Sequence, residues 1–85
     1  MMLQIHYFAS VREAVGRDRE QIELPGDVAT VADLVRHLRT VDAGFERMIG
    51  EQEQVLVAVN QAVAGDEGAV ADGDEVAFFP PMSGG

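Results

Sequence analysis

The chain has 85 residues and a formal net charge of −9, which arises from fifteen acidic residues and six basic ones, all of them arginines. At this length and with a hydrophobic content of 47%, we expect one small domain. We expect it to be cytoplasmic, because no apolar run is long enough to span a bilayer and no basic region precedes the first apolar stretch. The acidity argues against nucleic acid and membranes as partners and favours basic protein surfaces. The absence of cysteine excludes disulfides and a thiolate nucleophile. The absence of lysine excludes a P-loop and a Schiff-base amine.

Two strands and a short helix are predicted in the N-terminal part. Residues 3–8 alternate so that the apolar odd-numbered side chains share one face, which is typical of a half-buried strand. A capping box of the S-x-x-E type at Ser10 indicates a short helix, and Gly16 is its expected stop. Residues 20–24 alternate again, so we expect a second strand that ends before Pro25.

The main helix is the best-defined element of the sequence. Thr30 is the expected N-cap, and Asp33 at the third helical position resembles the second half of a capping box. We expect Gly44 to mark the end of the helix and residues 45–54 to form a connecting segment with room for one short helical turn. The helical spacing predicts a buried stripe of five residues, which are Val31, Leu34, Val35, Leu38 and Val41.

The C-terminal part reads as three further strands. Residues 55–59 are apolar without alternation, which indicates a strand covered on both faces, and residues 62–64 are expected to add a short strand after a turn. The turn sequence at 72–74 leads into a strand at 75–79, and Pro80-Pro81 ends it because neither residue has a backbone N–H to donate. We therefore predict an α+β fold, with a mixed sheet packed on one main helix over residues 1–79 and a flexible C-terminal tail over residues 80–85.

No catalytic or metal-binding constellation is apparent. His6 and His37 lack the spacing of metal ligands, and ordinary structural or surface roles are the better interpretation. The acidic residues at 72–75 fit a turn better than a calcium loop, since the further oxygen ligands of such a loop are missing. On its internal chemistry the chain is a binding module without a bound metal.

The reactive group that the sequence points to is the carboxyl group of Gly85. A terminal Gly84-Gly85 pair lacks side chains and suits a carboxylate that must enter a narrow channel, and the six residues from Pro80 onward reach about 20 Å when extended. A free carboxylate is ionised and a poor electrophile at neutral pH. Acyl chemistry at Gly85 therefore requires activation by another protein, most simply as an acyl-adenylate.

A docking surface is predicted beside this tail. Residues 55–59 and 76–79 are apolar on both faces, whereas one helix covers only one face of the sheet. We expect one of Phe78 and Phe79 to lie in the core and the other to contribute to an apolar patch for a partner. Coverage of that patch by the segment 45–54 is the alternative.

Three stretches of the chain resemble one family. The ending from Asp72 to Pro81, closed by Gly84-Gly85, is similar to that of the sulfur-carrying small subunits of molybdopterin synthase, and so are residues 7–13 and 59–61. The resemblance implies a β-grasp, ubiquitin-like fold and a cofactor-free chain. It further implies that an adenylating enzyme consumes ATP to activate Gly85 and that a sulfurtransferase donor supplies the sulfur of a C-terminal thiocarboxylate.

The same resemblance implies how the sulfur is delivered. The tail, which comprises Pro80, Pro81, Met82, Ser83 and Gly84 as well as Gly85, would insert into the large subunit of a heterotetrameric synthase. There it would donate sulfur to cyclic pyranopterin monophosphate in molybdenum cofactor biosynthesis. The chain would be a sulfur-donating, non-catalytic subunit, so whether it counts as an enzyme is left open.

Three other functions are compatible with the sequence. A sulfur carrier for thiamine or transfer-RNA thiolation shares the diglycine ending, although the Phe-Phe-Pro-Pro sequence fits it less well. A ubiquitin-like modifier would join its C-terminus to lysines of other proteins, while the lack of lysine excludes side-chain linkage between copies of this chain. A plain interaction domain with a flexible end is the third.

Overall fold

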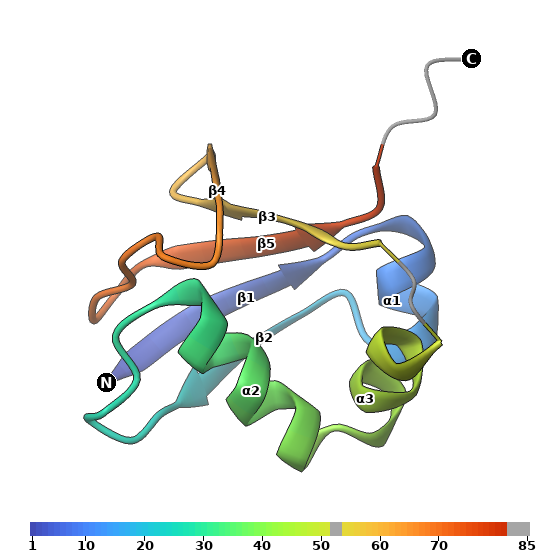
Figure 1. Ribbon diagram of the computed structural model, residues 1–85, viewed down its shortest axis with the longest axis horizontal. Helices are drawn as coiled ribbons and strands as arrows, with labels where there is room; N and C mark the ends of the chain where they lie inside the picture. The colour runs from blue at the N-terminus through green and yellow to red at the C-terminus, as the bar shows by residue number, and fades with distance from the viewer. Residues whose placement is uncertain (52–53, 82–85) are drawn as a thin grey trace.

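The computed structural model describes residues 1–51 and 54–81, and within them the chain forms five strands and three helices (Figure 1). The sheet has the order β2-β1-β5-β3-β4, in which β1 and β5 are parallel and the other neighbours antiparallel. The strands are β1 (Met2–Tyr7), β2 (Arg19–Glu23), β3 (Leu56–Val59), β4 (Ala62–Ala64) and β5 (Glu75–Phe79). The helices are α1 (Ala9–Val15), α2 (Val31–Val41) and α3 (Ala43–Gly50), and all three lie on one side of the sheet. The predicted α+β class with a mixed sheet is confirmed.

The core lies between the helices and one face of the sheet. Leu3, Ile5 and Tyr7 point into it from β1 and are at most 1% exposed, as the alternation of the sequence predicts. Val76 and Phe78 enter it from β5. The other face of the sheet has no helix over it within the described residues (Figure 1).

Helix α2 begins as the sequence predicts. The Thr30 hydroxyl accepts a hydrogen bond from the Asp33 N–H (3.2 Å), and the Asp33 carboxylate accepts one from the Thr30 N–H (3.2 Å), which completes the capping box. The stripe is shorter than predicted, however. Its last member, Val41, is 64% exposed, because the helix ends there and the chain turns at Asp42.

Helix α3 corrects the prediction of a connecting segment at 45–54 and of a helix end at Gly44. Asp42 is 8% exposed and caps the new helix by accepting a hydrogen bond from the Phe45 N–H (2.9 Å). Gly44 lies inside α3 where the helix crosses α1, and a Cβ at this position would collide with the Ala14 carbonyl oxygen. A glycine that looks like a helix stop is therefore needed for close packing of two helices.

Helix α1 also differs in its first residue. It begins at Ala9 without a side-chain cap, so the predicted capping role of Ser10 is wrong, since Ser10 already lies within the helix. The predicted stop at Gly16 is confirmed, because this residue has φ 89° and its N–H donates to the Arg12 carbonyl oxygen.

The last described residues are Pro80 and Pro81, which follow β5 directly. The predicted tail from Met82 to Gly85 lies outside the described residues. Among the helices described, none is long and apolar enough to cross a membrane.

Candidate functional site

The end of β5 separates two neighbouring aromatic rings. Phe78 is fully buried, with its ring stacked on Tyr7 at 6.0 Å between centroids and in edge contact with Phe45 at 5.3 Å. Phe79 is half-buried and pairs with Leu56 of β3, on the sheet face opposite the helices. The predicted division of the two rings is thus confirmed, and Phe78, because it is enclosed, is excluded as a partner contact.

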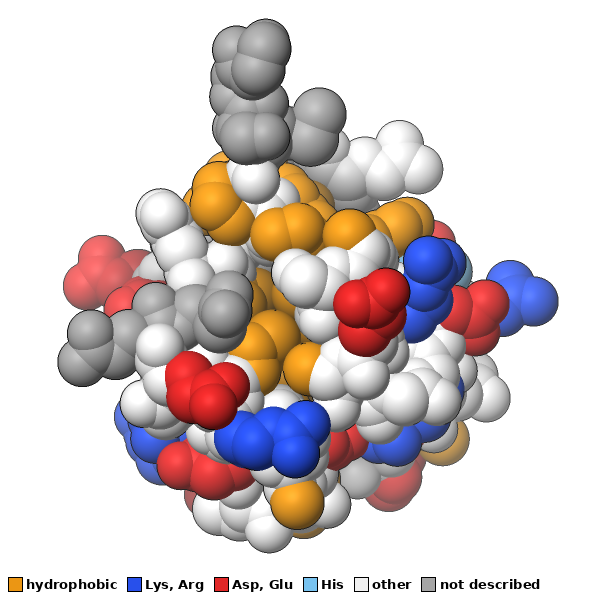
Figure 2. Space-filling model, turned by 90° about the vertical axis from the view of Figure 1, so that its right-hand side faces the viewer, with side chains coloured by type: hydrophobic (Ala, Val, Ile, Leu, Met, Phe, Trp, Pro, Cys, Tyr) orange, Lys and Arg blue, Asp and Glu red, His pale blue; other side chains and the backbone are white. Residues whose placement is uncertain are grey.

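Apolar side chains from β3, from β5 and from the residue that follows β1 lie on this open face. The Phe8 N–H, directly after β1, donates to the Phe78 carbonyl oxygen (3.0 Å), and the Phe8 side chain is 48% exposed. Ala77 and Phe79 come from β5 and Leu56 from β3, all three partly exposed. We call these four residues (Phe8, Leu56, Ala77 and Phe79) the apolar sheet face. Figure 2, viewed from the side of the molecule on which α1 and α3 lie, shows hydrophobic side chains gathered at this end of it.

Phe8 and Leu56 are two members of this face that the sequence does not single out. The sequence predicts Phe8 within the first strand without a role, and Leu56 within a strand covered on both faces. The alternation of residues 3–8 contained the necessary information, because a core position at Tyr7 places Phe8 on the opposite side. For Leu56 the register with Phe79 was needed, and register is not readable from a run of apolar residues.

The tail leaves the sheet at the border of the apolar sheet face. Pro80 is half-buried and Pro81 exposed, so the chain passes from the last strand into solvent within two residues. Met82, Ser83, Gly84 and Gly85, which the sequence predicts as the inserted tail and the reactive end, lie outside the described residues.

A partly buried polar network lies on the helix side of the sheet, beneath the site. The Tyr7 hydroxyl donates to the Glu20 carboxylate (2.7 Å), and Arg17 pairs with both Glu20 (3.0 Å) and Asp42 (2.5 Å). Burial, with a contribution from the Glu20 hydrogen bond, raises the pKa of Tyr7 far above its usual value. The network joins β1, β2 and the α2–α3 junction, and it holds the ring of Tyr7 against Phe78.

The histidine and acidic side chains of the described residues are the other candidates for a site. In residues 1–51 and 54–81, no three histidine, aspartate or glutamate side chains come together as a metal site would require. His6 lies on the open face of β1 with Nε2 at 3.4 Å from the Glu75 carboxylate, which agrees with an ordinary surface role. What remains is an apolar docking face next to the start of a tail that ends in Gly84-Gly85.

Comparisons with known proteins give a consistent result. The sequence model of the ThiS family matches residues 5–85. The molybdopterin synthase sulfur carrier subunit of Haemophilus influenzae is 40% identical over 84 residues, which cover 99% of this chain and 100% of that protein, and the Escherichia coli subunit is 39% identical with the same coverage. The crystal structure of SAMP1 from Haloferax volcanii matches 100% of both chains, with a TM-score of 0.79 and 32% identity. The expected ubiquitin-like β-grasp fold is thereby confirmed.

Proposed function

This chain belongs to the ThiS family, and on that basis we propose that it is the sulfur carrier subunit of a molybdopterin synthase. The Haemophilus influenzae and Escherichia coli relatives that bear this name match it over their whole length, and the name itself describes one subunit of a larger enzyme. The partner subunit in this proposal is the large subunit of the synthase, which would dock on the apolar sheet face.

The chemistry is confined to Gly85. An adenylating enzyme transfers AMP from ATP to the Gly85 carboxylate and releases pyrophosphate, which turns a poor electrophile into a reactive acyl-adenylate. A sulfurtransferase donor supplies hydrosulfide, which attacks the acyl carbon, and AMP leaves with the former carboxylate oxygen, so that Gly85 becomes a thiocarboxylate. Inside the large subunit the thiocarboxylate transfers its sulfur to cyclic pyranopterin monophosphate, and water supplies the oxygen that restores the Gly85 carboxylate.

One structural observation supports this proposal above the others. The apolar sheet face lies directly beside the point where the chain leaves β5, so a protein docked on Phe8 and Phe79 is positioned to receive the segment that follows Pro80. Apolar surface with exposed aromatic rings is the usual centre of a protein interface. Docking and delivery of the tail are then parts of one contact.

A second function is favoured by the similarity to SAMP1, the Haloferax volcanii small archaeal modifier protein 1. As a modifier, this chain would form an amide between Gly85 and a lysine of another protein. The activation step is the same in both functions, so the acceptor alone distinguishes them. With no lysine of its own, this chain is restricted to the donor role in any side-chain linkage.

The test is a reconstituted molybdopterin synthesis with two variants of the tail. Deletion of Gly85, or addition of one alanine after it, displaces the reactive carbon without changing any described residue. We expect both variants to keep the thermal unfolding of the parent chain and to lose sulfur transfer. Transfer at the parent rate by either variant would contradict the proposed mechanism.

A further inference from the structure

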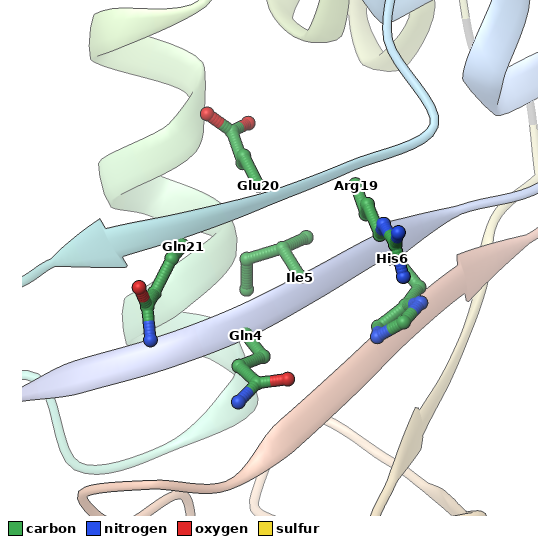
Figure 3. Close-up of a pocket in the computed structure, with 6 residues that line it drawn as sticks. All are labelled: Gln4, Ile5, His6, Arg19, Glu20 and Gln21. Atoms are coloured by element: carbon green, nitrogen blue, oxygen red, sulfur yellow. The ribbon is translucent and has the colours of Figure 1, made fainter.

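A polar groove lies between β1 and β2 on the open face of the sheet (Figure 3). The register of β1 with β2 places Gln4 opposite Gln21 and His6 opposite Arg19, and these four side chains line a shallow depression of about 340 Å³. Ile5 and Glu20 also border it, but Ile5 is fully buried and Glu20 reaches the Tyr7 hydroxyl on the helix side. The groove therefore presents two amides, one imidazole and one guanidinium to solvent.

Arg19, like Arg12 and Arg47, has no carboxylate partner among the described residues, and it is the one of these three that lines the groove. Arg17, Arg36 and Arg39 each pair with a carboxylate at 2.5 to 3.1 Å. Arg19 is exposed and makes no ion pair with any residue that the structure describes, although the chain has a net charge of −9. The carboxylate of Glu75, on the same face of the sheet, lies beside His6 at 3.4 Å.

The groove is continuous with the apolar sheet face through His6. The imidazole of His6 stacks on the ring of Phe8, with centroids 6.4 Å apart and planes 13° apart. Neighbouring strands in a sheet lie about 4.8 Å apart, so a partner seated on β5 and β1 needs to extend by only one strand to reach Arg19. Interfaces of this kind have an apolar centre and a polar rim.

We propose that Arg19 is a specificity-determining residue of the docking interface and that the groove receives a carboxylate side chain of the partner. The inference rests on the proposed function, since it takes the synthase large subunit as the partner. A guanidinium binds a carboxylate through two parallel hydrogen bonds, and the amides of Gln4 and Gln21 supply further donors. A cationic side chain in the same place would meet an unneutralised arginine. This is a local exception to the overall acidity, which by itself favours basic partners.

The proposal is tested by whether the affinity for the large subunit falls or rises when one positive charge is removed. Arg19→Gln and Arg36→Gln lower the net charge equally, but Arg36 lies on α2, on the far side of the sheet. We expect Arg19→Gln to weaken binding of the full chain to the large subunit by about tenfold at low salt, with a smaller difference at high salt. Arg19→Lys should restore part of the affinity. Arg36→Gln should leave the affinity unchanged or raise it slightly, because it makes the chain more acidic.

The other outcomes separate this inference from the proposed function. If Arg19→Gln binds as tightly as Arg36→Gln, or more tightly, the carboxylate contact is wrong while the docking face stands. If Phe79→Asp leaves binding unaffected, the partner docks elsewhere, and the role of the groove is overturned without affecting the chemistry at Gly85. If the parent chain does not bind the large subunit, both the proposed function and this inference are contradicted.

Discussion

The rings of Phe78 and Phe79 lie on opposite faces of the sheet although the residues are neighbours in the chain. The ring of Phe78 is enclosed by Tyr7 and Phe45, whereas Phe79 lies beside Leu56 on the face without helices. One aromatic residue thus stabilises the fold and the next is available to a partner. Substitutions at the two positions should therefore change different measured quantities.

Phe79→Asp should weaken binding to the large subunit by at least about tenfold, because it places a charge at the centre of an apolar interface. Its free energy of unfolding should change by no more than about 1 kcal/mol, since the side chain is only half-buried. Phe78→Leu is the matched control and should show the reverse, with a loss of about 1 to 2 kcal/mol in stability and nearly unchanged binding. Isothermal titration and urea unfolding measure the two quantities. A stability loss at Phe79 with unchanged binding would contradict the assignment.

Tyr7 is the only tyrosine of the chain and there is no tryptophan, so its ionisation can be followed directly by ultraviolet absorbance. Its pKa is raised in the folded state by burial and by the hydrogen bond to Glu20. The stability that this provides is fully present below the unfolded-state pKa of about 10 and is lost as the pH rises above it. Tyrosinate should therefore appear together with alkaline unfolding and not before it. Titration of Tyr7 near pH 10 in the folded protein would contradict the buried position of its hydroxyl.

Removal of the Tyr7 hydroxyl tests how much its hydrogen bond to Glu20 contributes to stability. Tyr7→Phe should lower the free energy of unfolding by about 1.5 kcal/mol, because a hydrogen bond to a charged group is lost while Glu20 keeps its pairing with Arg17. Binding at the opposite sheet face should not change. An unaltered unfolding midpoint would show that the hydrogen bond contributes nothing to stability.

Gly44 and Gly50 provide a matched pair within one helix. Gly44→Ala should destabilise the chain by about 1 to 3 kcal/mol, since the added methyl collides with the Ala14 carbonyl and forces α1 and α3 apart. Gly50→Ala adds the same methyl where no atom lies within 4 Å and should stabilise α3 by about 0.5 to 1 kcal/mol. Thermal unfolding of both variants measures the difference. Equal effects would contradict the close crossing of the two helices.

The elements that could be predicted from the sequence are those with local start and stop features. The strand at 75–79 is bounded by a turn and by Pro80, and α2 begins at a capping box whose two halves are three residues apart. Helix α3 also has a local N-cap in Asp42, but Gly44 at its second helical position has the sequence signature of a helix stop and hides the helix. Its N-cap, Asp42, is buried and forms an ion pair with Arg17, which lies 25 residues earlier in the chain.

Only part of the candidate site could be predicted, again because the rest depends on residues that are far apart in the sequence. The choice between Phe78 and Phe79 required the register of β5 with its neighbours, because the unbroken apolar run at 76–79 left it open. The position of Phe8, in contrast, follows from the alternation of residues 3–8, because Tyr7 in the core places Phe8 on the opposite face. The polar groove required the pairing of β1 with β2, since His6 and Arg19 are thirteen residues apart in the sequence.

The central claim is that Gly85 carries the sulfur, and intact-mass analysis tests it most directly. The chain is incubated with an adenylating enzyme, ATP and a sulfur donor, and its fragments are then sequenced by mass spectrometry. We predict the mass increase of one oxygen-to-sulfur replacement, confined to Gly85 and dependent on ATP. An unchanged C-terminus under conditions that convert a known sulfur carrier would contradict the proposed function.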